Sequence, residues 1–210
     1  MTADLTATSR SRRKPKGEGH ERRAEILAAA ERIFVDHGYE GATIRKIADE
    51  VGLSSTALYM HFADKGEILQ EICKQTFTAL LEANRSVIAE PASPVERMRR
   101  MMRAYIDFGF DNPNAYRLVY MTRPLELREG AQDAAREMGG DLFRSFQQVV
   151  EAAAAEGHVR GEPRATAQAL WAGGHGIVSL MIAKPYFDWV EREVLVDTLL
   201  EGLLAGLLKS

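Results

Sequence analysis

The segment between residues 43 and 65 constrains the fold of this chain more than any other. Ile44 and Ile47 begin an apolar pattern at helical spacing, which predicts a short helix with one buried side. Gly52 follows this pattern and suits a left-handed helix stop, and Ser54 can cap a second helix. Two short helices joined through a glycine form a helix-turn-helix.

The second helix of this pair has an apolar and a polar side. Ala57, Leu58 and Phe62 share the apolar side. The opposite side carries Ser55, Thr56, Tyr59 and Met60. Helix-turn-helix proteins place such an outward face in the major groove of DNA. We therefore expect this face to contact a DNA duplex.

A longer stretch, from residue 24 to residue 69, resembles the TetR family of bacterial transcriptional regulators. The matching positions are Phe34, His37-Gly38-Tyr39, Ala42-Thr43-Ile44, Ile47-Ala48, Val51-Gly52-Leu53-Ser54, Leu58-Tyr59, His61-Phe62 and Asp64-Lys65. The resemblance implies an all-α fold, in which a three-helix DNA-binding domain is joined by a connecting helix to a helical domain for ligand binding and dimerisation. We place the DNA-binding domain at residues 20–66 and the second domain at residues 67–210.

The expected DNA contacts lie within and beside the helix-turn-helix. They are Thr43, Arg45, Ser54, Ser55, Thr56, Tyr59, Met60, His61 and Lys65. The family resemblance assigns phosphate contacts to Tyr59, His61 and Lys65, and Thr43 can add a hydroxyl at a helix N-terminus. Arg45 is the best candidate for reading guanine, because the second helix has no Arg, Asn or Gln. Met60 replaces a tyrosine common in the family and offers only apolar contact. The alternative for each residue is a solvated surface.

The net charge of −3 does not by itself indicate nucleic acid, but the basic residues are unevenly distributed. Arg and Lys are concentrated between residues 10 and 23, beside the helix-turn-helix. Residues 1–19 contain almost no large apolar side chains, so we expect them to be disordered. This basic segment can lie along DNA as an arm, or it can be a tail that only improves solubility; we favour the arm.

Helical periodicity continues through the rest of the chain. We expect helices over residues 21–37, 64–87, 94–111, 114–121, 131–156, 163–183 and 188–208, separated by proline and glycine, and no strand. The hydrophobic content of 46% is ordinary for a globular protein. Cys73 is the single cysteine, and no apolar run is long enough to span a membrane. We therefore expect a cytoplasmic protein that does not bind membranes.

One helix-turn-helix has too small a footprint for tight specific binding, so we expect a homodimer on a palindromic double-stranded operator. Residues 164–183 are rich in Ala and Gly, and leucines recur every four residues between Leu195 and Leu207. These two segments are the expected dimer interface, in agreement with the family resemblance. The alternative is that they pack only within their own chain.

Methionine and aromatic residues gather between residues 98 and 121, with further aromatics later in the chain. The expected ligand-binding residues are Met102, Tyr105, Phe108, Tyr116, Tyr120, Phe143, Phe146, Trp171 and His175. Adaptable apolar side chains with a few hydroxyl groups suit a pocket for a mainly apolar small molecule. The family resemblance also implies an effector pocket here. The alternative is an ordinary hydrophobic core.

Residues 171–176 resemble the signature of a TetR subgroup whose C-terminal domain is named for its Trp, His and Gly residues. His175 is then either a core histidine or a ligand contact. The remaining histidines show no metal-ligand spacing with it, so we expect neither a metal nor a cofactor.

Together these features predict a repressor that a small-molecule effector releases from its operator. Release requires that the effector bind two arrangements of the dimer with unequal affinity. A DNA-binding regulator without a small-molecule ligand is the alternative. The sequence contains no serine-hydrolase, zinc-protease or phosphate-loop motif, so we do not expect an enzyme.

Overall fold

The computed structural model describes residues 18–121 and 129–209, and this part of the chain is helical without a β-strand. The elements are α1 (Glu18–Gly41), α2 (Ile44–Glu50), α3 (Ser55–Tyr59), α4 (Lys65–Ala89), α5 (Pro94–Asp111), α6 (Pro113–Tyr116), the π-helical segment η1 (Arg117–Met121), α7 (Glu129–Ala155), α8 (Pro163–Ala183) and α9 (Arg192–Leu207). The predicted all-α fold class is confirmed.

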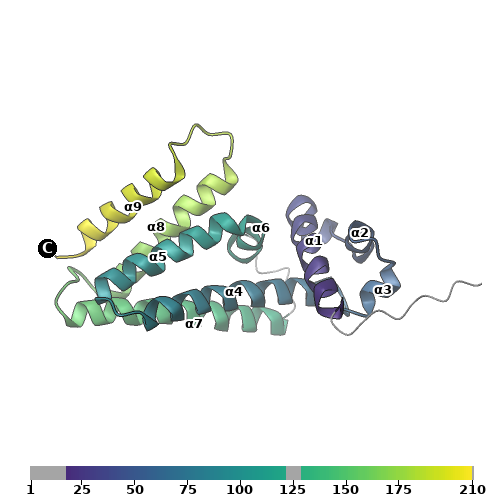
Figure 1. The fold of residues 1–210 in the computed structure, drawn as a ribbon, viewed down its shortest axis with the longest axis horizontal. Coiled ribbons are helices and arrows are strands. Elements are labelled where there is room, and N and C mark those ends of the chain that lie inside the picture. The colour runs from purple at the N-terminus through teal and green to yellow at the C-terminus, as the bar shows by residue number, and fades with distance from the viewer. Residues whose placement is uncertain (1–17, 122–128, 210) are drawn as a thin grey trace, which may run out of the picture.

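The molecule is elongated, with α1, α2 and α3 grouped at one end (Figure 1). Helix α4 starts in this group and runs along the remaining length, with α7 beside it. Helices α5 and α8 pack on this pair, and α9 lies along the outer edge against α8 and α5. The C-terminus is at the end farthest from α1–α3. One continuous helix, α4, therefore connects the two ends of the molecule.

Local signals in the sequence fix the helix-turn-helix. Thr43, Ser54 and Asp64 are the N-caps of α2, α3 and α4. Each side chain accepts a hydrogen bond from the backbone N–H three residues later, at 3.2, 3.1 and 2.9 Å. Gly52 has a φ of 66°, which confirms the predicted left-handed stop after α2. Three caps and one glycine thus set the directions of three consecutive helices.

Three element boundaries differ from the sequence prediction. Helix α1 begins at Glu18 and continues to Gly41, with a kink at Gly38, where φ is 68°. The predicted helix over 114–121 divides into α6 and the wider π-helical turn η1. Helix α9 begins at Arg192 rather than near residue 188, because the indole N–H of Trp189 donates to the Lys184 carbonyl at 3.0 Å and helps hold the preceding residues in a loop.

Two hydrophobic cores hold the described residues together. The core of α1–α3 also includes Ile68, Leu69, Ile72 and Cys73 from α4 and Leu118 from η1. The second core joins α4, α5, α6, α7, α8 and α9, with Tyr116 fully buried inside it. The predicted domain boundary after residue 66 stays a prediction, and the first core extends past it. Among the described helices, none is both long enough and apolar enough to cross a membrane.

Candidate DNA-binding surface and ligand cavity

The outward face of α3 is a mixed polar and apolar surface at the end of the molecule. Tyr59 and Met60 are 54% and 83% exposed, and Thr56 is also exposed. Ser55 is half-buried, and Leu58 on the opposite side of the helix is fully buried. The predicted division of α3 is therefore confirmed for buried Leu58 and for exposed Thr56, Tyr59 and Met60, whereas Ser55 and Ala57 are both half-buried.

The α2 side of this surface carries Arg45. Its side chain is 86% exposed and lies 3.7 Å from the Asp49 carboxylate, one turn further along the same helix. Such an exposed pair contributes little to stability, so the guanidinium can leave it at low cost. Thr43 and Ser54 are also exposed, and each uses its oxygen as an acceptor for a helix cap. A hydroxyl that accepts in this way still has an O–H to donate to a phosphate.

Lys65 has a structural role that the sequence did not reveal. Its Nζ donates to the Tyr39 carbonyl at 2.7 Å and to the Ala42 carbonyl at 3.4 Å, and it lies 4.2 Å from the centre of the Tyr39 ring. Glu40 adds an ion pair at 3.8 Å. The ammonium group therefore fastens the end of α1 to the start of α4. Its predicted phosphate contact stays a prediction.

Arg23 is a further residue that shapes this surface and that the sequence analysis missed. Its guanidinium lies 4.0 Å from the centre of the Phe62 ring and donates to the backbone carbonyl of His61. His61 itself is half-buried. Arg23 thus holds the chain directly after α3 against α1. In the sequence, Arg23 was noted only as the last residue of the basic segment, and this contact was not predicted.

A cavity of about 200 Å³ lies between α4, α5, η1, α7 and α8. Its wall consists of Phe77, Leu80, Asn84, Met101, Met102, Tyr105, Tyr120, Gly139, Leu142, Phe143, Phe146 and Trp171. No charged side chain is among these described lining residues. Six of the predicted ligand-binding residues form part of this wall: Met102, Tyr105, Tyr120, Phe143, Phe146 and Trp171.

The remaining predicted ligand-binding residues lie outside the wall. Phe108 is one turn further along α5 than Tyr105 and packs against the second core. Tyr116 is fully buried behind Tyr105, with their hydroxyl oxygens 2.9 Å apart. His175 is half-buried, and its Nδ1 lies 2.6 Å from the Tyr116 hydroxyl. Tyr116 and His175 therefore support the wall through Tyr105 rather than forming it.

The α4 side of the wall was not predicted. Phe77, Leu80 and Asn84 lie at successive turns of one helix face. The sequence analysis recognised the apolar spacing along this segment as a sign of a helix, but not as a cavity wall. Met101, Gly139 and Leu142 complete the set that it missed.

A chain of hydrogen bonds extends from the cavity into the second core. The Trp171 indole N–H donates to the Tyr105 hydroxyl at 3.3 Å, and Tyr105 connects through Tyr116 to His175. Burial raises the pKa values of Tyr105, Tyr116 and Tyr120 and lowers the pKa of His175. These groups are therefore uncharged at neutral pH. The Trp-His-Gly subgroup assignment stays a prediction.

Some of the small residues of α8 serve packing within the chain. A Cβ added at Gly173 would lie 2.5 Å from Leu203 of α9, and one at Gly174 would lie 2.5 Å from Met102 of α5. By contrast, a Cβ at Gly176 would have no neighbour within 4 Å. The glycine-rich stretch thus contributes both to packing within the chain and to an open face.

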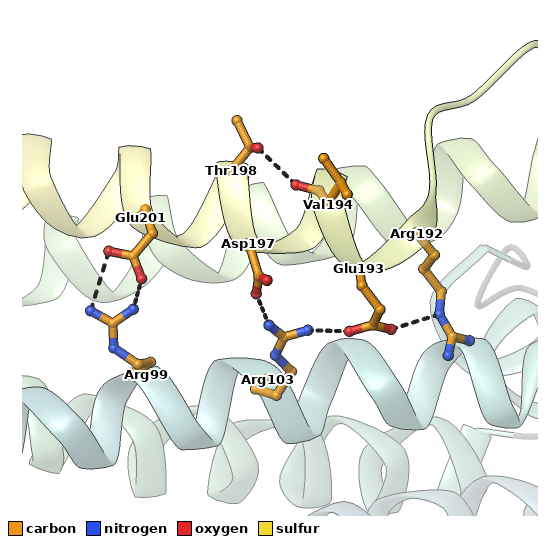
Figure 2. A network of polar contacts seen from close by, with 8 residues as sticks. All are labelled: Arg99, Arg103, Arg192, Glu193, Val194, Asp197, Thr198 and Glu201. Carbon is orange, nitrogen blue, oxygen red and sulfur yellow. Dashed lines mark hydrogen bonds and ion pairs between the residues drawn. The ribbon is translucent and has the colours of Figure 1, made fainter.

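Ion pairs attach α9 to α5 along the outer edge of the molecule (Figure 2). Arg103 pairs with Glu193 at 2.9 Å and with Asp197, and Arg99 pairs with Glu201. Because Met102 precedes Arg103, the same turn of α5 contacts both the cavity and α9. These pairs add polar contacts between α5 and α9 to the apolar packing of Val196, Leu200 and Leu204.

The sequence matches two family models. Residues 26–72 match a model described as bacterial regulatory proteins, tetR family. Residues 98–207, more than half of the chain, match a model described as Tetracyclin repressor-like, C-terminal domain. The first match contains the helix-turn-helix, and the second contains most of the cavity and the paired helices α8 and α9.

Individual relatives agree with these matches. The transcriptional activator FasR of Mycolicibacterium smegmatis is 31% identical over 131 residues, which cover 57% of this chain and 60% of FasR. The transcriptional repressor KstR2 of Mycobacterium tuberculosis is 31% identical over 111 residues, which cover 53% of this chain and 55% of KstR2. The chain thus spans less than two thirds of the length of these curated relatives.

The fold also matches a solved regulator structure. The crystal structure of AibR in complex with isovaleryl coenzyme A and operator DNA has a TM-score of 0.71 and 21% identity, over 89% of this chain and 97% of that chain. With its helix-turn-helix, its connecting helix and the family match over more than half of its length, the chain belongs to the TetR family of bacterial regulatory proteins.

Proposed function

We propose that this protein is a sequence-specific transcriptional regulator that binds a palindromic operator as a homodimer and is released by a mainly apolar small molecule. The observation that carries the proposal is the spatial arrangement of α4. At one end this helix holds the helix-turn-helix core, and at the other it forms one side of the cavity. A ligand in the cavity therefore contacts the helix that positions the DNA-binding surface.

The DNA step rests on the exposed face of α3. Thr56, Tyr59 and Met60 point away from the core, and their helix is held at both ends by Ser54 and by the Arg23 contact. Contacts of Tyr59, His61 and Lys65 with phosphates would set the orientation, while Thr56 and Arg45 would contact base edges. A dimer would present two such faces about 34 to 36 Å apart, one turn of DNA.

The dimer step rests on the open faces of α8 and α9. Ala172, Leu180 and Ala183 are exposed on α8, and Val194 and Gly202 are exposed on α9. Small and apolar side chains on two adjacent helices allow the close approach of a second copy. We expect the full chain to be a dimer in sedimentation measurements, and a monomer at micromolar concentration would contradict this step.

The effector step rests on the composition of the cavity and on its contacts. Tyr120 of η1 lines the cavity, whereas Leu118 of the same turn is buried in the core of α1–α3. Movement of this turn or of α4 would therefore shift the DNA-binding end. Such a shift needs a ligand that binds the two arrangements unequally. The ligand named for AibR, isovaleryl coenzyme A, joins a short apolar acyl group to a phosphorylated coenzyme, and only the acyl group resembles the occupant proposed for this cavity.

Repression is the proposed outcome of DNA binding, as the name of KstR2 indicates for that relative. FasR is named an activator, so the position of the operator relative to the promoter decides between the two outcomes. A reporter gene behind the selected operator measures this directly. Deleting the regulator should raise reporter expression, and a fall would identify an activator. Since its target is bacterial DNA, we infer that the protein acts in the cytoplasm.

Residues 10–17, the larger part of the basic segment near the N-terminus, lie outside the described residues, and the role of this segment as a DNA arm stays a proposal. Arm contacts with phosphates would release counterions, so removing them would weaken binding and reduce its dependence on salt. We expect deletion of residues 1–17 to produce both effects in anisotropy titrations between 50 and 200 mM salt. If DNA affinity depends on salt concentration equally with and without this segment, the segment is a tail that does not contact DNA.

A selection from random double-stranded oligonucleotides tests the DNA step. The purified protein should enrich an inverted repeat, and the double variant Thr56→Ala/Tyr59→Ala should bind this repeat at least about tenfold more weakly, a loss of about 1.4 kcal/mol. Thr78→Ala is the control, because Thr78 is also exposed but lies in the middle of α4. An enrichment no different from random DNA would refute the proposal.

A further inference from the structure

Asn84 is a buried polar residue in an otherwise mostly apolar part of the cavity wall. Its exposed fraction is 7%, and it lies one turn beyond Leu80 on α4. Met101 and Phe146 also line the cavity. Among the described residues, no hydrogen bond to the Asn84 carboxamide is found. Asn84 lines the cavity, so its carboxamide borders this space without a hydrogen-bond partner among the residues that the structure describes.

An unpaired buried amide is costly. Removing such a group from water without a compensating hydrogen bond is unfavourable, and most buried polar groups in proteins are paired. The cavity offers space for the missing partner, since about 200 Å³ equals the liquid volume of roughly seven water molecules. The residue thus favours any cavity occupant that supplies a hydrogen-bonding atom at this position.

The Tyr105 hydroxyl and the Trp171 indole N–H are two other polar groups of the wall, and both have partners. The Tyr105 hydroxyl is bonded to Tyr116 and to the Trp171 indole. The Tyr120 ring packs against Phe77, two turns of α4 away from Asn84. These aromatic groups therefore form one end of the cavity, and the free carboxamide of Asn84 lies toward the other end.

Charge further limits the occupant. No Lys, Arg or His is among the described wall residues, so an ionised group in this cavity would lose its hydration without gaining a counter-ion. A neutral oxygen loses far less hydration free energy when it enters the same cavity. The carboxamide NH₂ can donate to a carbonyl oxygen, and its Oδ1 can accept from a hydroxyl group. Both kinds of neutral group satisfy Asn84.

We propose that Asn84 determines effector specificity, by selecting an uncharged and mainly apolar compound whose buried part carries a carbonyl or hydroxyl oxygen. This inference rests on the proposed function, in which the cavity holds the effector. It adds a chemical class and the residue that recognises it. Apolar contacts with the ring and methionine side chains supply affinity, and the hydrogen bond to Asn84 supplies discrimination.

Two probes of nearly equal shape test this inference. Propiophenone and propylbenzene differ only by a carbonyl group in place of a methylene group. We expect the wild-type protein to bind propiophenone about tenfold more tightly in calorimetric titrations, which corresponds to one buried hydrogen bond of about 1.4 kcal/mol. The anion 3-phenylpropionate should not bind. Equal affinity for the ketone and the hydrocarbon would overturn the inference without the use of any variant.

Asn84→Leu supplies the second measurement. This variant should bind the two neutral probes within about twofold of one another, and its melting temperature without ligand shows whether it is folded. Gln75→Leu makes a comparable change on an exposed face of α4 and should keep the wild-type preference. If Asn84→Leu folds and keeps the preference, Asn84 does not select the ligand, although the effector cavity stands. If no probe binds to any of the proteins, both the inference and the proposed effector cavity fail.

Discussion

Gly109 permits the close approach of α5 to α8, and its replacement by alanine should destabilise the protein. A Cβ at this position would lie 2.6 Å from Cγ1 of Val178 and 3.0 Å from Cδ2 of Tyr116. Both neighbours are fully buried, and valine has little rotamer freedom in a helix. Tyr116 is also held by hydrogen bonds to Tyr105 and His175, so neither side chain has an easy movement available.

Two opposing free energies determine the result for Gly109→Ala. Overpacking in a well-packed core costs about 1 to 3 kcal/mol, and the rigid neighbours place this site in the upper half of that range. Alanine offsets about 1 kcal/mol of this cost, because its helix propensity is higher than that of glycine. The net loss of stability is thus about 1 to 2 kcal/mol. For a chain of this length we expect a melting temperature lowered by roughly 2 to 8 °C.

Thermal unfolding followed by circular dichroism measures this change. Gly140→Ala is the control, because its added Cβ would lie 3.2 Å from Nη1 of Arg144, the flexible end of an exposed side chain. There the propensity gain should dominate and raise the melting temperature. If Gly109→Ala unfolds at or above the wild-type temperature, the packing between α5 and α8 is looser than the distances indicate, and the reasoning is refuted.

Three further predictions concern buried and surface groups. Burial raises the pKa of the Cys73 thiol to about 11, so the native protein should not react with Ellman's reagent at pH 8, whereas the denatured protein should. Because burial lowers the pKa of His175, the unfolded chain binds a proton there more readily. Stability in urea should therefore decrease as the pH falls below about 6.5, and less so in His175→Gln. Arg103→Met removes exposed ion pairs and should cost at most about 1 kcal/mol, whereas Leu200→Ala in the core under α9 should cost about 2 to 5 kcal/mol in denaturant titrations.

The helix-turn-helix was predictable because its signals are local. An N-cap such as Ser54 bonds to a backbone group three residues away, and Gly52 adopts its conformation through its own backbone freedom. Sequence order alone therefore contains this information. The contacts of Lys65 with Tyr39 and Ala42 depend instead on how α1 meets α4, which no local pattern specifies.

The cavity was predictable in composition but not in outline. Tyr105 and Tyr116 looked equivalent in the sequence, yet the packing of α6 places Tyr116 behind Tyr105. Asn84 was not predicted as a cavity residue, because a polar residue within a helical pattern usually indicates a surface position. The glycines of α8 show a similar limit, because composition does not distinguish Gly173, which faces α9 of the same chain, from the open position of Gly176.

The double use of α4 has a consequence for how such a regulator diversifies. A mutation at Phe77 or Leu80 alters the cavity and also perturbs the packing of α4, the helix that positions the DNA-binding end. Leu142 and Phe143 line the same cavity from α7, which contributes no residue to the core of α1–α3 among the described residues, so changes there reshape the cavity without altering α4 itself. Duplicated genes should therefore acquire new chemical preferences chiefly through α7, while α4 drifts slowly. Comparing substitution rates along the two helices in closely related species would reveal this asymmetry.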